Sequence, residues 1–128
     1  MIPKFRAWHK TWEEMGKVKR IRFDDDGNVN TVLFKGREFG VNATIDKIDL
    51  MQSTGLYDEN GKEIFEGDIL HHQIQTDYTF IVKYDEDNAR WYGDGLSRTY
   101  RIDITKHFMQ YYKVIGNIYE NPELLEVE

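Results

Sequence analysis

The sequence predicts a mainly β protein, a β-rich α+β chain built of short antiparallel strands and hairpins. Segments rich in β-branched and aromatic residues recur at intervals of roughly ten residues, with clusters of Asp, Asn and Gly between them. The two prolines, Pro3 and Pro122, lie near the ends, so nothing inside the chain has the composition of a stiff linker. This pattern favours a barrel or a sandwich over alternating β–α–β units.

The first half is predicted to begin with a strand followed by a hairpin. Residues 5–8 are short, aromatic and bounded by polar residues, which indicates a strand. Residues 17–23 alternate with a period of two, as expected of a half-buried strand. Its faces would carry Lys19, Ile21 and Phe23 on one side and Val18, Arg20 and Arg22 on the other. Residues 24–28 form the turn, since Asp, Asn and Gly tolerate positive φ, and residues 29–34 return as the partner strand.

Further strands are predicted along the rest of the chain. Residues 43–52 are assigned to a strand, and residues 80–84 pair with the aromatic residues 91 and 92 in a second hairpin. Residues 121–125 begin with Asn-Pro-Glu, which predicts a short terminal helix. The remaining assignments are strands at residues 97–102 and 113–118, and a helical turn or strand at residues 105–112.

Length and composition indicate one compact domain with two lobes. The 128 residues are 40% hydrophobic and 31% charged, enough apolar surface to offset chain entropy. We expect an N-terminal β-hairpin lobe over residues 1–54 and a small β-barrel-like lobe over residues 55–128. The chain has no cysteine, which excludes disulfides and thiolate nucleophiles and suits a cytoplasmic location. No run approaches the ~18 apolar residues of a membrane span, so no membrane partner is expected.

The net charge of −6 is unevenly distributed. Residues 1–64 carry 11 basic and 11 acidic side chains, whereas residues 65–128 carry 6 and 12. The overall acidity argues against a general nucleic-acid binder, whose affinity comes mostly from neutralising phosphates. The first 22 residues nevertheless contain seven basic and two acidic side chains, so a local nucleic-acid site stays open. Its candidate residues are Lys4, Arg6, Trp8, Trp12, Lys19, Arg20 and Arg22.

Three segments together resemble one protein family. They are the opening residues 4–8 (KFRAW), the central residues 50–70 (LMQSTGLYDENGKEIFEGDIL) and the closing residues 114–125 (VIGNIYENPELL). In this order they resemble the YopX family of phage and prophage proteins. The resemblance covers nearly the whole chain. It implies a small barrel similar to SH3 domains in the second half, a phage context with action in the host-cell cytoplasm, and assembly into homo-oligomers. It implies no catalytic residue and no cofactor, because the family has no established activity.

The polar and glycine residues of these segments are interpreted as structural. Glycines at turns and bulges permit backbone conformations that a Cβ would oppose. An Asp or Asn in a tight corner accepts backbone N–H groups, as we expect of Asp68 and Asn117. The residues assigned to this turn motif are Gly55, Asn60, Gly61, Gly67, Asp68, Gly116 and Asn117.

Three functions are weighed from the sequence alone. No metal site is predicted, because His71 and His72 would point to opposite faces of a strand and the acidic turn of residues 24–28 lacks calcium-loop spacing. No catalytic motif is present either. The preferred function is a non-enzymatic module that binds a host or phage protein through an aromatic-rich β surface. The alternatives are a nucleic-acid-binding module using the basic N-terminal hairpin and, ranked last, a metal-dependent hydrolase.

Overall fold

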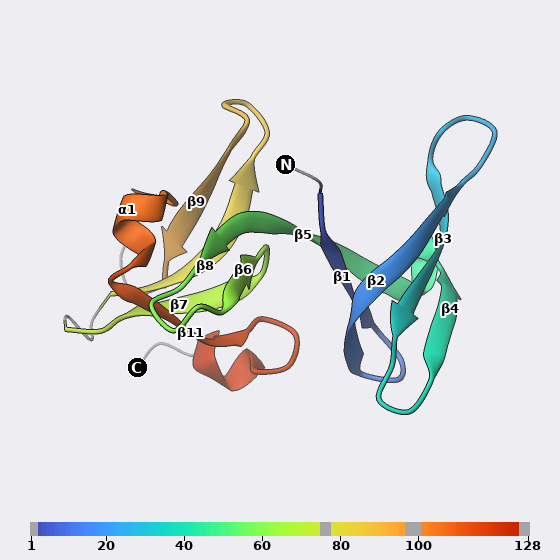
Figure 1. The fold of residues 1–128 in the computed structure, drawn as a ribbon, viewed down its shortest axis with the longest axis horizontal. Helices are drawn as coiled ribbons and strands as arrows, with labels where there is room; N and C mark the ends of the chain where they lie inside the picture. The colour runs from blue at the N-terminus through green and yellow to red at the C-terminus, as the bar shows by residue number, and fades with distance from the viewer. Residues whose placement is uncertain (1–2, 75–77, 97–100, 126–128) are drawn as a thin grey trace. The chain divides into compact units, whose positions relative to one another are not determined.

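The mainly β prediction is confirmed by a computed structural model of the 128-residue chain. The structure describes residues 3–74, 78–96 and 101–125. The chain divides into two compact units, Ile2–Gln52 and Ser53–Glu128, which we call the N-terminal and the C-terminal unit. Each unit is built around antiparallel strands, which Figure 1 colours from blue to red along the chain.

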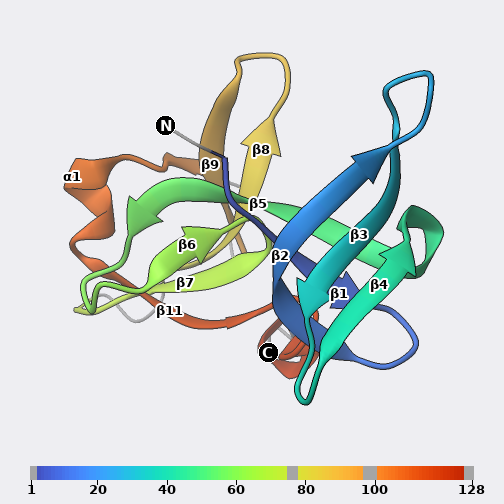
Figure 2. The ribbon, with the colours of Figure 1, turned by 45° about the vertical axis from the view of Figure 1, so that its right-hand side comes forward.

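The N-terminal unit is an antiparallel sheet with the strand order β4-β3-β2-β1-β5. Figure 2 shows β2, β3 and β4 side by side along this sheet. The strand β5 continues into the C-terminal unit, where its second half pairs with β6. A single turn of 3₁₀ helix, η1, separates β4 from β5. The bounds are β1 Phe5–His9, β2 Glu14–Phe23, β3 Val29–Lys35, β4 Gly40–Thr44, η1 Ile45–Lys47, β5 Ile48–Tyr57 and β6 Glu63–Phe65.

One face of this sheet forms the core of the N-terminal unit. Phe34 pairs with Val18 and Val41 across the sheet, and Val32 pairs with Ile21 and Ala43. Since directly opposed residues lie on the same face, these pairs stack their side chains in one layer. The buried members of the layer are Ala7, Val32, Phe34, Val41, Ala43 and Ile48.

The simple alternation predicted for residues 17–23 is wrong at Val18. The register of β2 against β3 shifts between Val18 and Arg20, so two steps on β2 match one step on β3. Such a bulge inserts one extra residue and resets which side chains share a face. Val18 and Ile21 therefore both pack against the core, while Arg20 and Arg22 stay exposed.

The C-terminal unit holds a five-stranded antiparallel sheet with the order β10-β9-β8-β7-β11. The predicted hairpin of residues 80–92 is β8 and β9, which pair from Phe80 opposite Gly95 to Asp85 opposite Arg90. The closing helix is a 3₁₀ turn, η2, and part of the predicted strand 97–102 lies outside the described residues. The bounds are β7 Asp68–His72, β8 Thr79–Asp85, β9 Arg90–Gly95, β10 Arg101–Asp103, α1 Lys106–Met109, β11 Tyr112–Asn117 and η2 Pro122–Leu125.

The expectation of an SH3-like barrel in the second half is not confirmed. Among the described residues β10 pairs with β9 and β11 pairs with β7, and no pairing between these two edge strands closes the sheet. The sheet is open, with a core on one face closed by α1. Its buried residues are Ile64, Leu70, Phe80, Val82, Ile104, Met109, Tyr112 and Val114.

Gly16 provides a test of the packing in the N-terminal unit. It lies in β2 opposite Ala7, and a Cβ at this position would overlap the backbone carbonyl oxygen of Lys35. Because a backbone atom cannot move aside cheaply, we expect Gly16→Ala to lower the free energy of unfolding by about 2–3 kcal/mol. Urea denaturation followed by circular dichroism measures this loss.

Gly40→Ala is the matched control. At Gly40, also in a strand, the added Cβ would lie 3.5 Å from Leu33 Cδ1, an ordinary van der Waals contact. This variant should unfold close to the parent protein. Equal midpoints for the two variants would contradict the packing described for Gly16.

Candidate functional site

The structure separates the basic and aromatic residues that the sequence grouped as one site. Lys4 is exposed before β1, whereas Arg6 in β1 is only 9% exposed and its Nε donates to Met51 Sδ at 3.4 Å. Trp8 is half-buried in β1. Trp12 is exposed in the β1–β2 turn, where its ring stacks on His9 with centroids 4.3 Å apart. Lys4 and Trp12 are therefore exposed to a ligand, whereas Arg6 is buried and Trp8 is partly covered.

Lys19, Arg20 and Arg22 lie near the other end of β2. At the ordinary rise of a strand, the six steps from Glu14 to Arg20 span about 20 Å. The ring of Trp12, which precedes Glu14, is therefore not beside the two arginines. Trp12 and these two arginines are thus not parts of one continuous surface.

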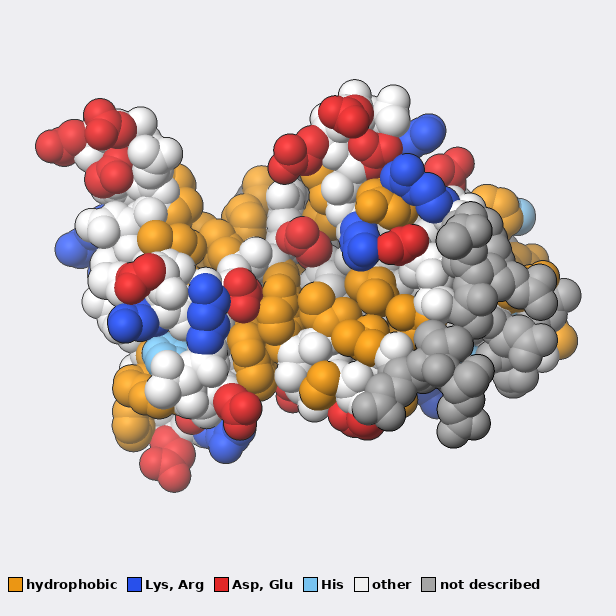
Figure 3. All heavy atoms as spheres, turned by 180° about the vertical axis from the view of Figure 1, so that it is seen from behind, with side chains coloured by type: hydrophobic (Ala, Val, Ile, Leu, Met, Phe, Trp, Pro, Cys, Tyr) orange, Lys and Arg blue, Asp and Glu red, His pale blue; other side chains and the backbone are white. Residues whose placement is uncertain are grey.

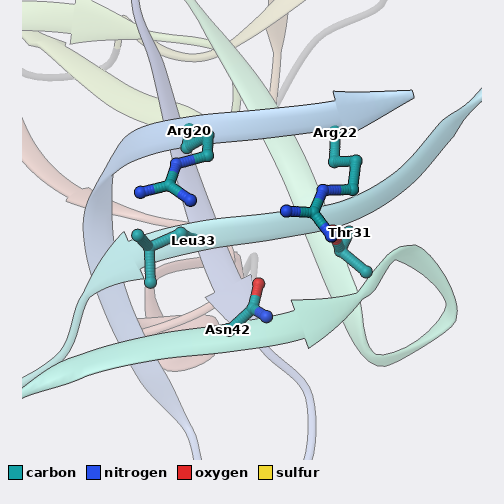
Figure 4. Close-up of a pocket in the computed structure, with 5 residues that line it drawn as sticks. All are labelled: Arg20, Arg22, Thr31, Leu33 and Asn42. Carbon is teal, nitrogen blue, oxygen red and sulfur yellow. The ribbon is translucent and has the colours of Figure 1, made fainter.

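Arg20 and Arg22 border a hollow on the outer face of β2, β3 and β4. The hollow has a volume of about 110 Å³ and is lined by these arginines with Thr31, Leu33 and Asn42. Register places Leu33 between Arg20 on β2 and Asn42 on β4, and Thr31 opposite Arg22. Figure 4 shows both arginine side chains extending from β2 towards β3. We call this feature the arginine hollow. The sequence singled out its arginines but not the other three residues.

The charges around the arginine hollow are unevenly placed. Lys17 and Lys19 on β2 and Lys35 on β3 are exposed. Acidic side chains gather beyond them at the tip of the β2–β3 hairpin, in the turn of residues 24–28, as Figure 3 shows. There the Asp24 carboxylate accepts the backbone N–H groups of Asp26 and Asn28, so this carboxylate shapes the turn. The positive charge is thus confined to the strands.

A cluster of aromatic and histidine rings lies on the C-terminal unit, on α1 and near the end of β7. The ring of Tyr111 stacks on His72 with centroids 6.3 Å apart and meets His107 edge-on at the same distance. His107 in turn contacts Phe108, with centroids 5.8 Å apart. The backbone N–H of Ile74 donates to His72 Nδ1 at 3.1 Å. We define the aromatic patch as His72, Ile74, Tyr78, His107, Phe108 and Tyr111.

His71 and His72 do point to different surroundings. His71 Nδ1 lies 2.9 Å from Thr79 Oγ1 on the neighbouring strand, while His72 joins the aromatic patch. Within residues 3–74, 78–96 and 101–125, no three His, Asp or Glu side chains are grouped as metal ligands. This part of the chain therefore offers no support to the metal-dependent hydrolase. It also contains no helix long and apolar enough to cross a membrane.

The glycines of the turn motif have specific backbone roles. Gly55, Gly61 and Gly67 have φ of +79°, +79° and +86°, a region that L side chains disfavour. Gly116 has a different role, because a Cβ there would lie 2.5 Å from Asn121 Oδ1. That oxygen accepts the backbone N–H of Asn117, so the close approach belongs to the closing turn.

Polar side chains of the same motif accept backbone N–H groups at short range. Asp68 is 1% exposed, and its Oδ2 accepts the N–H of Phe65 at 2.8 Å. Asn117 Oδ1 accepts the N–H groups of Tyr119 and Glu120 at 3.0 and 2.8 Å. Asn60 is exposed, and its backbone N–H donates to Asp58 Oδ1. These residues hold backbone in place rather than forming a cavity.

Asp58 joins two distant segments of the chain. Its carboxylate is 6% exposed, and Oδ1 accepts the N–H groups of Asn60 and Lys62 at 2.9 and 2.8 Å. Oδ2 accepts the N–H of Val114 in β11 at 2.9 Å. The sequence assigned Asn60 and Gly61 to a turn motif but did not identify this long-range bond, because local turn composition carries no information about a partner in a later strand.

The three segments that resemble a family are therefore joined to one another by strand pairing and by a side-chain-to-backbone hydrogen bond. Arg6 of the opening segment pairs with Met51 of the central one, and Asp58 binds Val114 of the closing one. A protein-family model, described as "YopX protein", matches residues 4–126. The chain belongs to the YopX family. The resemblance read from the three segments is thus confirmed.

Two solved structures have the same YopX fold. One is the crystal structure of protein EF1440 from Enterococcus faecalis, which is 35% identical, with a TM-score of 0.74 over 98% of this chain and 99% of that chain. The other is the crystal structure of yopX from Bacillus subtilis, 18% identical, with a TM-score of 0.61 over 98% of this chain and 97% of that chain. At 18% identity the likeness concerns the fold alone. No curated protein matches the chain.

The hydrogen bonds of the buried Asp58 carboxylate predict that its replacement lowers the stability of this YopX-family chain. Asp58→Asn replaces one acceptor oxygen by an NH₂ group, so at least one of the three backbone N–H groups loses its partner. A buried donor left unsatisfied costs about 1–3 kcal/mol, and we expect a loss of this size in urea denaturation. Hydrogen exchange at the Val114 amide should also accelerate.

Asp25→Asn removes the same charge from an exposed turn residue and serves as the control. We expect this variant to unfold within about 0.5 kcal/mol of the parent protein. If Asp58→Asn unfolded at the same urea concentration as Asp25→Asn, Asp58 would not have the structural role described.

Proposed function

We propose that this protein is a non-enzymatic binding module that recognises another protein through the aromatic patch. The observation that carries the proposal is the exposure of large apolar side chains at one place on the C-terminal unit. Ile74 is 81% exposed, Phe108 47% and Tyr111 45%. In Figure 1, α1 and the C-terminal end of β7 lie at the same end of this unit.

The chemistry of the aromatic patch is that of an interface centre. None of its six members carries an acidic or lysine side chain, and such charges are depleted at the centres of protein interfaces whereas Tyr and Phe are enriched. Removing apolar surface from water lowers the free energy by about 25 cal/mol per Å², so a partner that covers the patch is favoured. Larger exposed apolar patches commonly mark such sites.

The rings of the aromatic patch are also preorganised by contacts with one another. Tyr111 is held between His72 on one side and His107 on the other, with both ring centroids 6.3 Å from its own. His72 is further packed edge-on against the buried ring of Tyr112, 5.1 Å away. Side chains already restricted lose less conformational entropy when they bind, which favours affinity for a given contact area.

The phage context implied by the family resemblance supplies the class of partner. The proposed partner is a protein of the host or of the phage, met in the host-cell cytoplasm, which offers an apolar surface to the rings. A second copy of the chain is the competing occupant. Light scattering of the purified protein distinguishes the two, since only self-association raises the mass without an added partner.

The double variant Ile74→Glu/Phe108→Glu tests the proposal. Both side chains are exposed, so charge can be added without burying it, and the fold should persist. We expect the parent protein, fixed on a resin, to retain a defined protein from host or infected-cell lysate, and the double variant to lose it at least tenfold. Quantitative mass spectrometry of the retained proteins measures this ratio.

Phe23→Glu/Phe39→Glu is the matched control. These phenylalanines are 58% and 71% exposed on the N-terminal unit, so the control adds the same charge to equally exposed apolar positions. The control should retain the same protein as the parent. Identical retention by all three proteins, or retention of nothing above background by the parent, would contradict the proposal.

A further inference from the structure

The two arginines of the arginine hollow are exposed cations that converge on one place. Some basic side chains elsewhere in the described residues do have protein partners. Arg37 donates to the Glu13 carbonyl oxygen at 2.9 Å, and Lys83 pairs with Asp94 at 2.7 Å. The guanidinium groups of Arg20 and Arg22 have no hydrogen bond or ion pair with the described part of the chain.

The local fold creates this convergence. The bulge after Val18 places Arg20 on the solvent face of β2. Arg22 lies on the same face, because side chains two residues apart on a strand point the same way. Register then places Leu33 beside Arg20 and Thr31 beside Arg22. Figure 4 shows the guanidinium groups over β3, with Asn42 approaching from β4. The hollow thus has two cations, two polar side chains and an apolar floor.

We propose that the arginine hollow binds the phosphodiester backbone of a single nucleic-acid strand. A guanidinium presents a planar fork of donors that matches two phosphate oxygens, and two such groups on one face hold neighbouring oxygens together. The Thr31 hydroxyl and the Asn42 amide add donors at the rim. The site lies on the N-terminal unit and does not depend on the aromatic patch.

The surrounding charge favours a chain of phosphates over an isolated anion. Exposed Lys17, Lys19 and Lys35 extend the positive surface along β2 and β3 from the Arg20 end of the hollow. A linear array of cations is matched by a ligand whose charge repeats along its length, as in a nucleic-acid strand. The acidic turn beyond Arg22 and the net charge of −6 restrict binding to this face.

The residues that line the hollow also predict which parts of the nucleic acid are contacted. None of the five lining residues is aromatic, so the hollow provides no ring on which a base stacks. Contacts are made to phosphate and sugar, which carry no sequence information directly. Binding is therefore sequence-independent and strongly weakened by salt. The two tryptophans first grouped with these arginines take no part.

The test compares Arg20→Gln/Arg22→Gln with the parent protein in binding a fluorescein-labelled oligothymidylate, followed by fluorescence anisotropy across a salt series. We expect the double variant to bind at least about tenfold more weakly at low salt, since each charge-assisted hydrogen bond lost costs about that factor. For single strands, two phosphates fewer should also make the slope of log K against log salt shallower by about 1.4.

Two further variants separate a formed site from general electrostatic attraction. Lys62→Gln/Lys113→Gln removes the same charge from exposed positions of the C-terminal unit and should leave affinity nearly unchanged. Arg20→Lys/Arg22→Lys keeps the charge but loses the planar fork, so it should bind several-fold more weakly than the parent with a similar salt slope. Equal losses in the Gln variants of both units would overturn the proposal, as would full affinity in the arginine-to-lysine variant or no binding by the parent at low salt. Unchanged melting temperatures verify that the variants fold.

Discussion

The buried carboxylate of Asp58 is the interaction on which the C-terminal unit depends most. One side chain accepts three backbone N–H groups, two from its own turn and one from Val114, which lies 56 residues further along the chain. The turn thereby covers the outer edge of β11, where the Glu59 N–H also donates to the Tyr112 carbonyl oxygen. An edge strand covered in this way is not open to pairing with another chain. The carboxylate thus closes a turn and terminates a sheet with the same two oxygens.

The residues of the family's three segments are needed to satisfy buried backbone hydrogen-bonding groups. Buried N–H and C=O groups must be paired, and the residues of these segments supply the partners. Asp68 binds the N–H of Phe65, while the Gly67 carbonyl oxygen accepts the N–H of Ile118. Positive φ at Gly55 and Gly67 lets the chain take the turns that bring these groups together. A YopX-like sequence is therefore recognisable by the residues that its turns require.

The two proposed binding surfaces consist of side chains that the fold leaves exposed. The N-terminal unit exposes a basic strand surface with a hollow between Arg20, Arg22 and Asn42, and the C-terminal unit exposes rings around Tyr111. The two surfaces have opposite chemistry, because one attracts anions through charge and the other sequesters apolar groups from water. A shared fold does not assign a ligand to either, since unrelated functions occupy the same architecture. Direct binding measurements on each surface are what distinguish them.

The sequence by itself determined the mainly β class, the hairpins and the family. Alternation with a period of two and clusters of Asp, Asn and Gly act locally, so residues 24–28 and 85–88 are readable as turns without knowledge of the rest of the chain. Only the tertiary structure decided that Arg6 is buried against Met51 while Arg20 is exposed, although both are arginines in predicted strands. It also decided the bulge after Val18 and the open sheet in place of a barrel. Such features depend on register between segments far apart in the sequence, and a shift of one residue exchanges the faces of a strand without altering its local pattern.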